Sequence, residues 1–536
     1  PFLFHANALI YALFGDNDYT ARIVPALFGV AIIILPYYLR KWLGRTGALV
    51  VALLFTISPS VLYYSRYIRN DIYIAVWAML LTIALFRYID ERKDKWLYIG
   101  AAAMMMAILT KEVAYMTGFI GITFILLAIV LERLSPDTRR AVKVVMAIVA
   151  VALLIASAVI LATAGGAPEG SVLAALHTLV QYLIVAAGLL IGAIFACILY
   201  DGERQWVRTA VRSIGWRAII ISVLIALILF ALLSTTFFSN PAGLWTAGGG
   251  AIAYWLEQHG VQRGGQPWFY YVALLLPMYE FLPLLFSILA IAYYLIRGVR
   301  DRNNGQDRLF IAYLVYWWVL ALVLYSWAGE KMPWLVVHPV QPMILLAGRF
   351  VGDIITSANW QRIRSRGGAY LAPVLVLLGV ALVTALGSQP FQGMSIWNLQ
   401  DTGQWFTAVI AMVLLAVVAG NLIRRLGGHA SVAVAALTLF AIFGLATIRF
   451  AWMASYINYD YVNEYLVYAH AGPDVKPALA EIEEISRRTV GDKEIKVAYD
   501  DDSTWPLEWY FRDYTNRTFY GAQPSRESLD APVVIV

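Results

Sequence analysis

The sequence predicts an all-α polytopic membrane protein with about 14 transmembrane helices and a small α/β domain at its C-terminal end. Hydrophobic residues make up 61% of the 536 residues and charged residues 14%, whereas a soluble protein is about one-quarter charged. Apolar runs of about 20 residues, long enough to cross a bilayer, recur along the chain. Loops rich in Lys and Arg also alternate with loops that lack them, as the two faces of a membrane require.

The N-terminal residues are expected to lie on the membrane rather than across it. Residues 2–14 are too short and too polar to span, and their apolar side chains form a helical stripe. We therefore expect an interfacial helix and a loop over residues 1–20. The transmembrane domain is expected over residues 21–457, with spans near residues 21–39, 47–64, 72–88, 96–110, 113–131, 141–163, 172–199, 217–237, 268–296, 309–327, 334–356, 369–387, 405–423 and 430–453.

Basic side chains orient these spans. Alternate loops carry clusters of Lys and Arg, at residues 40–45, 87–95, 133–143, 204–217, 297–308, 362–366 and 424–425. Positively charged loops stay in the cytoplasm. The remaining loops are therefore expected outside, among them residues 63–71, 111–112, 238–267 and 328–333. The pattern predicts a multi-pass protein of the cytoplasmic membrane whose chemically interesting loops all face outward.

A separate domain is expected at the C-terminal end. From about residue 458 the composition becomes polar, which predicts a small extracytoplasmic α/β domain over residues 458–536. A helix is expected over residues 478–488, a strand over 494–499 and a second helix over 505–510. Residues 531–536 have the pattern of a strand that is only beginning. We therefore expect this domain to be incomplete in the present sequence.

Cysteine and histidine usage limits the cofactors. The one cysteine, Cys197, lies in an apolar run, so neither an intrachain disulfide nor a thiolate zinc site can form. The six histidines are scattered without metal-ligand spacing. A divalent cation is left open as a cofactor, with no pattern that indicates one. The net charge of +6 is accounted for by Lys and Arg on one membrane face, so no nucleic-acid partner is expected.

The loop at residues 63–71 is more polar than a plain membrane hairpin needs. Charges at the edge of a bilayer are costly unless they are paired, solvated or used. Arg66 and Arg69 can hold a phosphate, and Asp71 can take a proton from a hydroxyl or orient one. These three side chains are the first candidate site residues.

Two pairs of opposite charges lie in very short outer loops. Lys111 and Glu112 separate two spans with almost no loop. They either form a mutual ion pair or supply a lysine for a phosphate with a carboxylate beside it. Glu330 and Lys331 lie between two helix breakers, a glycine and a proline, which are compatible with a structural kink or with a binding site.

The long outer loop at residues 238–267 ends in a glycine-rich stretch that holds His259 and Arg263. Glycines expose backbone N–H groups beside the arginine, which suits an anionic oxygen, although His259 is also compatible with an ordinary polar loop residue. Glu280 lies within the span that follows. A carboxylate at this depth predicts either a functional group or a buried, hydrogen-bonded one.

Four motifs in this order resemble those of the GT-C membrane glycosyltransferases. They are residues 15–25, 65–71, 110–112 and 330–335, the last followed by Pro339 and Pro342. The wider group is the protein O-mannosyltransferase and aminoarabinose-transferase type, which uses polyprenyl-phosphate sugars. Residues 262–271, 464–468 and 505–510 are similar to a prokaryotic branch associated in archaea with lipid-linked sugar handling. The resemblance extends over essentially the whole chain.

The resemblance implies an inverting sugar transferase at the outer membrane surface, with a polyprenyl-phosphate sugar donor and membrane lipid as partners. Asp71 and Glu112 are then the visible residues that position the acceptor hydroxyl. The donor phosphate and sugar would be bound by residues drawn from all these loops, namely Arg66, Arg69, Lys111, His259, Arg263, Glu280, Glu330 and Lys331.

One expected feature of such enzymes falls outside the sequence. They place the main catalytic Asp in the first outer loop, and here that residue is expected before Pro1. Asp16 and Asp18 lie too close to the next span to replace it.

Two functions of other classes remain open. A flippase-associated or transport component for lipid-linked sugars needs charged residues along a path to the cytoplasmic side, and apart from Glu280 the spans offer few. A non-catalytic subunit of a membrane assembly also fits a long apolar chain. The enzyme interpretation predicts that one cavity is lined by Asp71, Lys111, Arg263, Glu330 and Lys331.

Overall fold

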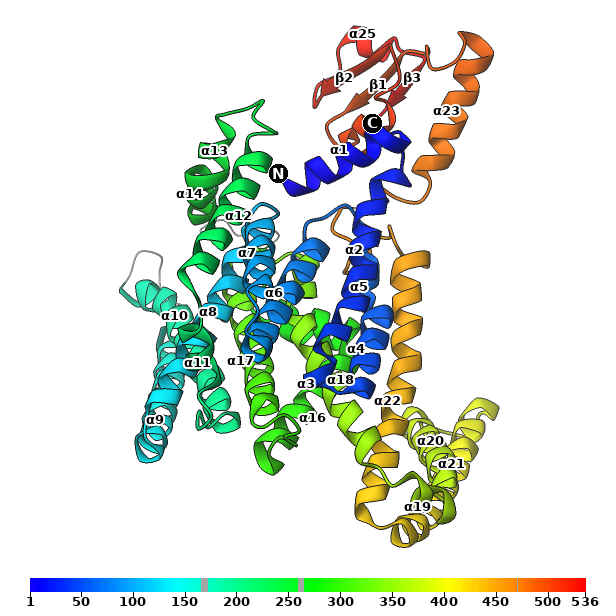
Figure 1. Cartoon of the computed structure of the whole chain (residues 1–536). Coiled ribbons are helices and arrows are strands. Elements are labelled where there is room, and N and C mark those ends of the chain that lie inside the picture. The colour runs from blue at the N-terminus through cyan, green and yellow to red at the C-terminus, as the bar shows by residue number, and fades with distance from the viewer. Residues whose placement is uncertain (165–171, 259–264, 470) are drawn as a thin grey trace. The chain divides into compact units, whose positions relative to one another are not determined.

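The computed structural model describes residues 1–164, 172–258, 265–469 and 471–536, and most of them are helical (Figure 1). Contacts divide the chain into two compact units, Pro1–Ala451 and Trp452–Val536. The division falls a few residues before the boundary expected at residue 458. The prediction of an all-α membrane fold with a small α/β region at the C-terminal end is confirmed.

The first half of unit 1 consists of helices joined by short connections. Their order and bounds are α1 (Phe2–Phe14), η1 (Thr20–Arg22), α2 (Ile23–Ile34), η2 (Leu35–Leu39), α3 (Arg40–Leu43), α4 (Arg45–Ile57), α5 (Pro59–Tyr64), α6 (Asp71–Glu91), α7 (Lys95–Ile108), α8 (Ala114–Arg133), α9 (Pro136–Ala164), α10 (Val172–Leu199), α11 (Trp206–Arg212), α12 (Trp216–Ser234), α13 (Gly243–Trp245), η3 (Thr246–Gly250) and α14 (Ala251–Gln258).

The second half continues in the same way. It contains η5 (Tyr270–Leu275), α15 (Leu276–Tyr279), α16 (Phe281–Arg297), α17 (Gln306–Trp327), η6 (Pro333–Val336), α18 (Val337–Ser357), α19 (Trp360–Ser365), α20 (Gly368–Gly387), α21 (Ile396–Leu426) and α22 (Gly428–Trp452).

The number of full spans is lower than predicted. In the described part of the chain, 11 helices are long and apolar enough to cross a membrane, or up to 12 if the bent pair α15/α16 counts as one span. Two predicted spans, 47–64 and 96–110, are the shorter apolar helices α4 and α7. Ser58 and Pro59 end the first, because proline cannot continue a helix from its interior. Helices of this length reach only about 20 Å across a core of about 30 Å.

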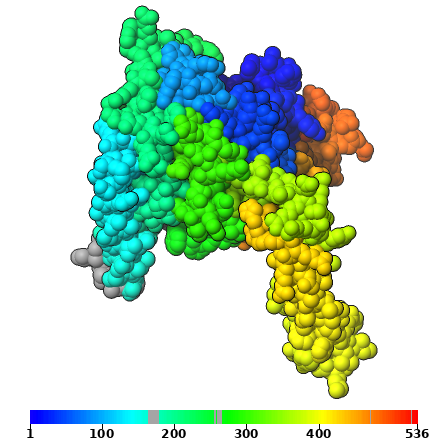
Figure 2. Space-filling model, turned by 60° about the horizontal axis from the view of Figure 1, so that its bottom comes forward, coloured from blue at the N-terminus to red at the C-terminus, as the bar shows by residue number. Residues whose placement is uncertain are grey.

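Burial separates central helices from peripheral ones. The span that begins at Pro333 and contains α18 is 100% buried and α17 is 78% buried, whereas α9, α12, α20 and α21 are each 11% buried. The exposed apolar faces of the peripheral helices are the surfaces that lipid covers. Figure 2 shows the region of α20 and α21 (yellow) standing away from the rest of unit 1.

Glycines let α4 cross α18 at close range. A Cβ atom added at Gly47 would lie 3.3 Å from the backbone oxygen of Gly348, and one added at Gly352 would lie 2.6 Å from the Cα atom of Gly47. Small residues at a helix crossing allow the backbones to approach, which is a common way of packing helices in membranes. This crossing fixes the central helix α18, which carries functional candidates near both of its ends.

Unit 2 is a small α/β domain. After η7 (Met453–Ile457) it contains α23 (Val475–Thr489), β1 (Val497–Asp500), α24 (Thr504–Tyr510), β2 (Arg517–Gly521), α25 (Arg526–Leu529) and β3 (Val533–Ile535). The strands are parallel in the order β2-β1-β3, and Val497 pairs with Arg517 on one side and Val533 on the other. The predicted helices and the predicted strand lie at these places, but β2 was not predicted.

Candidate functional site

Asp71 is the first residue of α6, and its side chain is wholly buried. A carboxylate in the first turn of a helix is favoured by the macrodipole. Lys111 Nζ lies 3.1 Å from Asp71 Oδ1 and 3.3 Å from Oδ2, and His338 Nε2 lies 3.1 Å from Oδ1. A carboxylate only accepts hydrogen bonds, so both nitrogens must donate. Side chains of α6, of the α7–α8 connection and of α18 therefore meet at one buried charge.

An aromatic side chain holds the histidine in place. The ring of Tyr325, near the end of α17, stacks on His338 with centroids 5.1 Å apart and an interplanar angle of 18°. Gln341, one turn further along α18, donates from Nε2 to the backbone oxygen of Ala75 at 2.9 Å and so ties α18 to α6. The imidazole orientation is thus determined by packing on one side and by Asp71 on the other.

Two cations of this region face the same indole. Arg69 Cζ lies 3.6 Å from the ring centroid of Trp334, and Lys111 Nζ lies 5.7 Å from it. Such contacts hold a cation without neutralising it. Arg69 Nε is buried and makes no hydrogen bond among the described residues. Arg69, Asp71, Lys111, Trp334 and His338 are referred to below as the Asp71 cluster.

Lys331 lies three residues before Trp334, and only 9% of its surface is exposed. Burial lowers the pKa of this lysine. In the part of the chain that the structure describes, no carboxylate lies within ion-pair distance of it, Glu330 included. Its loop is fixed by Tyr271, whose hydroxyl donates to the backbone oxygen of Met332 at 2.9 Å. A mostly buried ammonium without a counter-charge is costly, and an anionic ligand would relieve that cost.

Tyr64, at the end of α5, also belongs to these surroundings. Burial raises the pKa of its hydroxyl well above the ordinary value, and Tyr63, Tyr270 and Asp71 add to the effect. The predicted site residue Arg66 lies two positions further along the chain and is half-buried. Tyr64 is thus close enough to Tyr270, at the π-helical start of the following span, for the two hydroxyls to affect each other electrostatically.

The mutual ion pair considered for Lys111 and Glu112 does not form. Lys111 is bonded to Asp71 instead, while Glu112 is half-buried beside it in the chain. Neighbouring residues at a helix end point in different directions, so Lys111 can reach across to α6 only by turning away from Glu112. The role of Glu112 in positioning an acceptor stays a prediction.

Glu280 lies at the 111° bend between α15 and α16 and is wholly buried. Its Oε1 accepts hydrogen bonds from Ser58 Oγ and Ser60 Oγ, both at 2.6 Å, and from the backbone N–H of Ser60 at 3.0 Å. Oε2 has no hydrogen-bond partner among the described residues. Glu280 thus anchors the first turn of α5, the helix that leads into the loop at residues 63–71. Its predicted contact with substrate stays a prediction.

Two predicted site residues, His259 and Arg263, lie outside the described residues. Three members of the surroundings were not predicted as site residues: Tyr325, Trp334 and His338. His338 carried a usable signal, because an ionisable residue inside a span indicates function. Among the described residues, no three side chains of His, Cys, Asp or Glu are grouped so that they could hold a metal ion.

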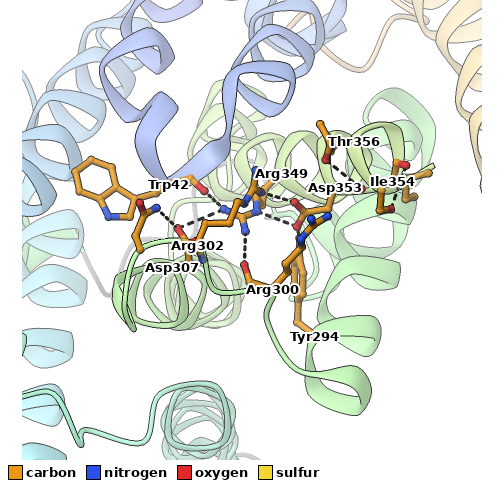
Figure 3. A network of polar contacts seen from close by, with 12 residues as sticks. Trp42, Tyr294, Arg300, Arg302, Asp307, Arg349, Asp353, Ile354 and Thr356 are labelled. Atoms are coloured by element: carbon orange, nitrogen blue, oxygen red, sulfur yellow. Dashed lines mark hydrogen bonds and ion pairs between the residues drawn. The ribbon is translucent and has the colours of Figure 1, made fainter. Parts of the chain in front are cut away.

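A second buried network of charges lies near the other end of α18 (Figure 3). Arg349 is wholly buried, and its Nε donates to Asp353 Oδ2 at 2.9 Å. Its Nη2 donates to the backbone oxygen of Arg300 at 3.0 Å, and its Nη1 contacts the Trp42 carbonyl and lies 3.5 Å from Asp307. Together with Tyr294 and Arg302, which both bond to Asp353, these side chains form the Arg349 network.

Comparisons with known proteins give a family match over part of the chain and a similar solved structure. Residues 1–162, which include Asp71, Lys111 and Glu112, match the family model described as dolichyl-phosphate-mannose-protein mannosyltransferase. This match bears out the predicted GT-C type of enzyme. A search of curated proteins finds no match. Among solved structures, the chain is similar to the crystal structure of ArnT from Cupriavidus metallidurans in the apo state, with 16% identity, a TM-score of 0.46, and coverage of 99% of this chain and 76% of that one.

Proposed function

We propose that this multi-pass membrane protein is a GT-C glycosyltransferase that transfers a sugar from a polyprenyl-phosphate donor to an acceptor at the outer face of the cytoplasmic membrane. One observation carries the proposal: the Asp71 cluster has more positive charge than its carboxylate can balance. Asp71 faces Lys111, and Arg69 lies close enough to act on its charge. Lys331, nearly buried and without a counter-charge among the described residues, belongs to the neighbouring loop. A surplus of partly desolvated cations suits the phosphate of a lipid-linked sugar.

The chemistry that this arrangement supports is displacement at the anomeric carbon. The acceptor oxygen forms a bond to that carbon, and the bond from the carbon to the donor phosphate oxygen breaks with its electron pair. The departing polyprenyl phosphate gains negative charge, which preorganised cations such as Lys111 and Arg69 stabilise more strongly in the transition state than in the bound donor. The proton of the acceptor hydroxyl passes to a carboxylate that acts as general base.

Asp71 itself is better suited to organising the site than to removing a proton. Its oxygens already accept from Lys111 and His338, and it is wholly buried. A carboxylate so engaged holds two donors in fixed positions at a charge of minus one. Glu112, half-buried and next to Lys111 in the chain, is the visible carboxylate left to orient an acceptor.

An apolar cavity lies where the lipid tail of such a donor could run. It has a volume of about 370 Å³ and is lined mainly by side chains of α6, α7, α8 and α11, including Leu85, Leu97, Met104 and Ile122. Met104 precedes Lys111 by two helical turns, or about 10 Å along the chain. A donor whose phosphate lies at Lys111 would therefore reach this cavity with the first isoprene units of its tail.

The test is sugar transfer by the purified chain in nanodiscs. A panel of polyprenyl-phosphate sugars, labelled in the sugar, is incubated with host membranes as the source of acceptors, and release of polyprenyl phosphate is measured. We expect Lys111→Ala to lower transfer by about 10²–10³-fold. Lys93→Ala, which removes an exposed lysine that pairs with Glu91, is the matched control and should transfer at the parental rate.

A second variant separates catalysis from folding. Lys111→Ala leaves the buried Asp71 without its ammonium partner, so its thermal unfolding is measured in parallel. Arg69→Gln removes a cation that makes no direct bond to Asp71, and it should lower transfer while unfolding normally. If the parental protein binds the donors but returns them all unchanged, the transferase proposal is wrong and a transport role is favoured.

A further inference from the structure

The helices from α19 to α22 carry charge of one sign at one end. Between Asp353 and Asp460 the sequence contains a single acidic residue, Asp401. Asp401 lies in the first turns of α21, and Arg424 and Arg425 lie in its last turn, so about 35 Å of helix separates them. Three further arginines, Arg362, Arg364 and Arg366, lie in and just after α19. Five arginines therefore gather where α19, α20 and α21 meet, with no acidic residue nearby in the sequence.

The fold turns three of these arginines toward one cavity. It has a volume of about 560 Å³ and is lined by Arg364, Ser365, Arg366, Gly367, Tyr370, Leu422 and Arg425. Gly367 connects α19 to α20 with φ of 81°, a conformation that glycine adopts without strain. Arg366 Nη1 donates to the backbone oxygen of Arg425 at 3.1 Å, which ties the end of α19 to the end of α21. The walls of the cavity thus come from two separate segments.

A packed base supports the cavity. Ile363, Leu371 and Leu426 are buried side chains of one apolar cluster that joins α19, α20 and α21. The arginines above this cluster are exposed, and no carboxylate of the described residues lies within ion-pair distance of Arg364, Arg366 or Arg425. Their charge is therefore available to a ligand rather than consumed inside the protein.

The surroundings identify the class of ligand. Only 11% of α20 and of α21 is buried, so lipid covers their apolar faces, and Figure 2 shows this region (yellow) standing away from the rest of unit 1. The arginines lie at the ends of these helices, at the depth of lipid headgroups. Guanidinium groups bind phosphate oxygens in pairs, and basic pockets between spans on one membrane face bind anionic headgroups.

We propose that the cavity formed by Arg364, Arg366, Tyr370 and Arg425 binds the headgroup of an anionic phospholipid, whose acyl chains lie along the exposed faces of α20 and α21. The bound headgroup offsets part of the positive charge of Arg364, Arg366 and Arg425 and fixes the α20–α21 hairpin relative to α19. This site is separate from the Asp71 cluster and does not depend on the proposed sugar transfer.

The test measures retention of lipid by the full chain. The protein is purified in mild detergent with equal amounts of phosphatidylglycerol and phosphatidylcholine, and bound lipid is counted by native mass spectrometry. We expect phosphatidylglycerol to be retained preferentially and to raise the unfolding temperature. The triple variant Arg364→Gln/Arg366→Gln/Arg425→Gln should lose this preference by about tenfold or more.

The matched control removes the same number of charges from the first turns of α9, as Arg139→Gln/Arg140→Gln/Lys143→Gln, and should retain the preference. Unfolding in phosphatidylcholine alone checks that both triple variants fold. Equal retention of the two lipids by the parental protein, or an equal loss in the control, would overturn the proposal. Full stabilisation by inorganic phosphate would also overturn the proposal, because it would assign the cavity to a free anion. Retention of an acidic protein in place of lipid would overturn it as well.

Discussion

The Asp71 cluster and the Arg349 network lie near opposite ends of α18, and they are built differently. In the Arg349 network, Arg349 and Arg302 face Asp353 and Asp307, so two cations meet two carboxylates. In the Asp71 cluster, one carboxylate faces Lys111, Arg69 and a histidine. The first arrangement is balanced in charge, while the second has a surplus of positive charge.

The difference indicates what each region is for. Buried ions lose hydration, and a network recovers that free energy only when every charge and hydrogen-bonding group is matched. The Arg349 network meets this condition through side chains and backbone carbonyls of α3, α16, residues 300–307 and α18, so it holds these four segments together. In the Asp71 cluster, by contrast, the buried Arg69 Nε has no hydrogen-bond partner among the described residues. Incomplete pairing of this kind is typical of sites that a ligand completes.

Removal of Arg349 should have the largest effect, and on stability. Arg349→Ala leaves Asp353 and Asp307 buried with too little positive charge, which we expect to lower the free energy of unfolding by about 3–5 kcal/mol. Unfolding of the purified protein in detergent measures it. Arg302→Ala is the control, because Arg302 is 34% exposed and should cost less. An Arg349→Ala protein as stable as the parent would show that the network is not a structural anchor.

Removal of Lys331 should have the opposite profile, with a loss of activity rather than of stability. Because no carboxylate of the described residues pairs with it, Lys331→Ala breaks no ion pair and should unfold at or above the parental temperature. If Lys331 holds the leaving phosphate, kcat should fall by about 10²–10³-fold. Lys331→Arg should restore activity only in part, because the planar guanidinium group does not occupy the same position as the compact ammonium group. Parental transfer by Lys331→Ala would assign the residue to the helix end alone.

The pH dependence should separate the two regions further. Burial holds the pKa of Lys331 below its ordinary value of 10.5. As the pH rises through the lowered pKa, the folded protein loses this charge and activity should fall. Over the same range up to 10.5, the unfolded chain binds more protons than the folded one, so the contribution of Lys331 to stability becomes more favourable. The basic limb of kcat/KM should be absent in Lys331→Ala and unchanged in Lys93→Ala.

Glu280 should give the smallest effect, because it resembles the Arg349 network in being held by donors of the protein itself. Glu280→Gln keeps an acceptor for Ser58 and Ser60 and should lower the free energy of unfolding by about 1 kcal/mol, whereas Glu280→Ala leaves their donors unpaired and should cost about 1–3 kcal/mol. Sugar transfer by Glu280→Gln should remain close to the parental rate. A Gln variant that folds but does not transfer would instead support the substrate contact that the sequence suggested.

Sequence periodicity determined the helices well and the contacts poorly. Every predicted span overlaps a helix of the structure, because apolar runs reflect the thickness of the bilayer whatever lies around them. The two predictions that failed as full spans, at residues 47–64 and 96–110, contain the shorter helices α4, which Ser58-Pro59 ends, and α7, which ends at Ile108. The polarity of the loop at residues 63–71 also identified Asp71 and Arg69 as unusual, because charges at the edge of a bilayer are costly unless they are paired, solvated or used.

Tertiary structure alone decided which charges meet. Lys111 bonds to Asp71, 40 positions away, rather than to the adjacent Glu112. His338 joins them from 267 positions away, and Arg349 reaches the Trp42 carbonyl across 307. Local patterns of hydrophobicity record which face of a helix is apolar but not which helix lies beside it. Long-range packing around α18 therefore made one buried cluster balanced and left the other with the positive charge that an anionic donor can use.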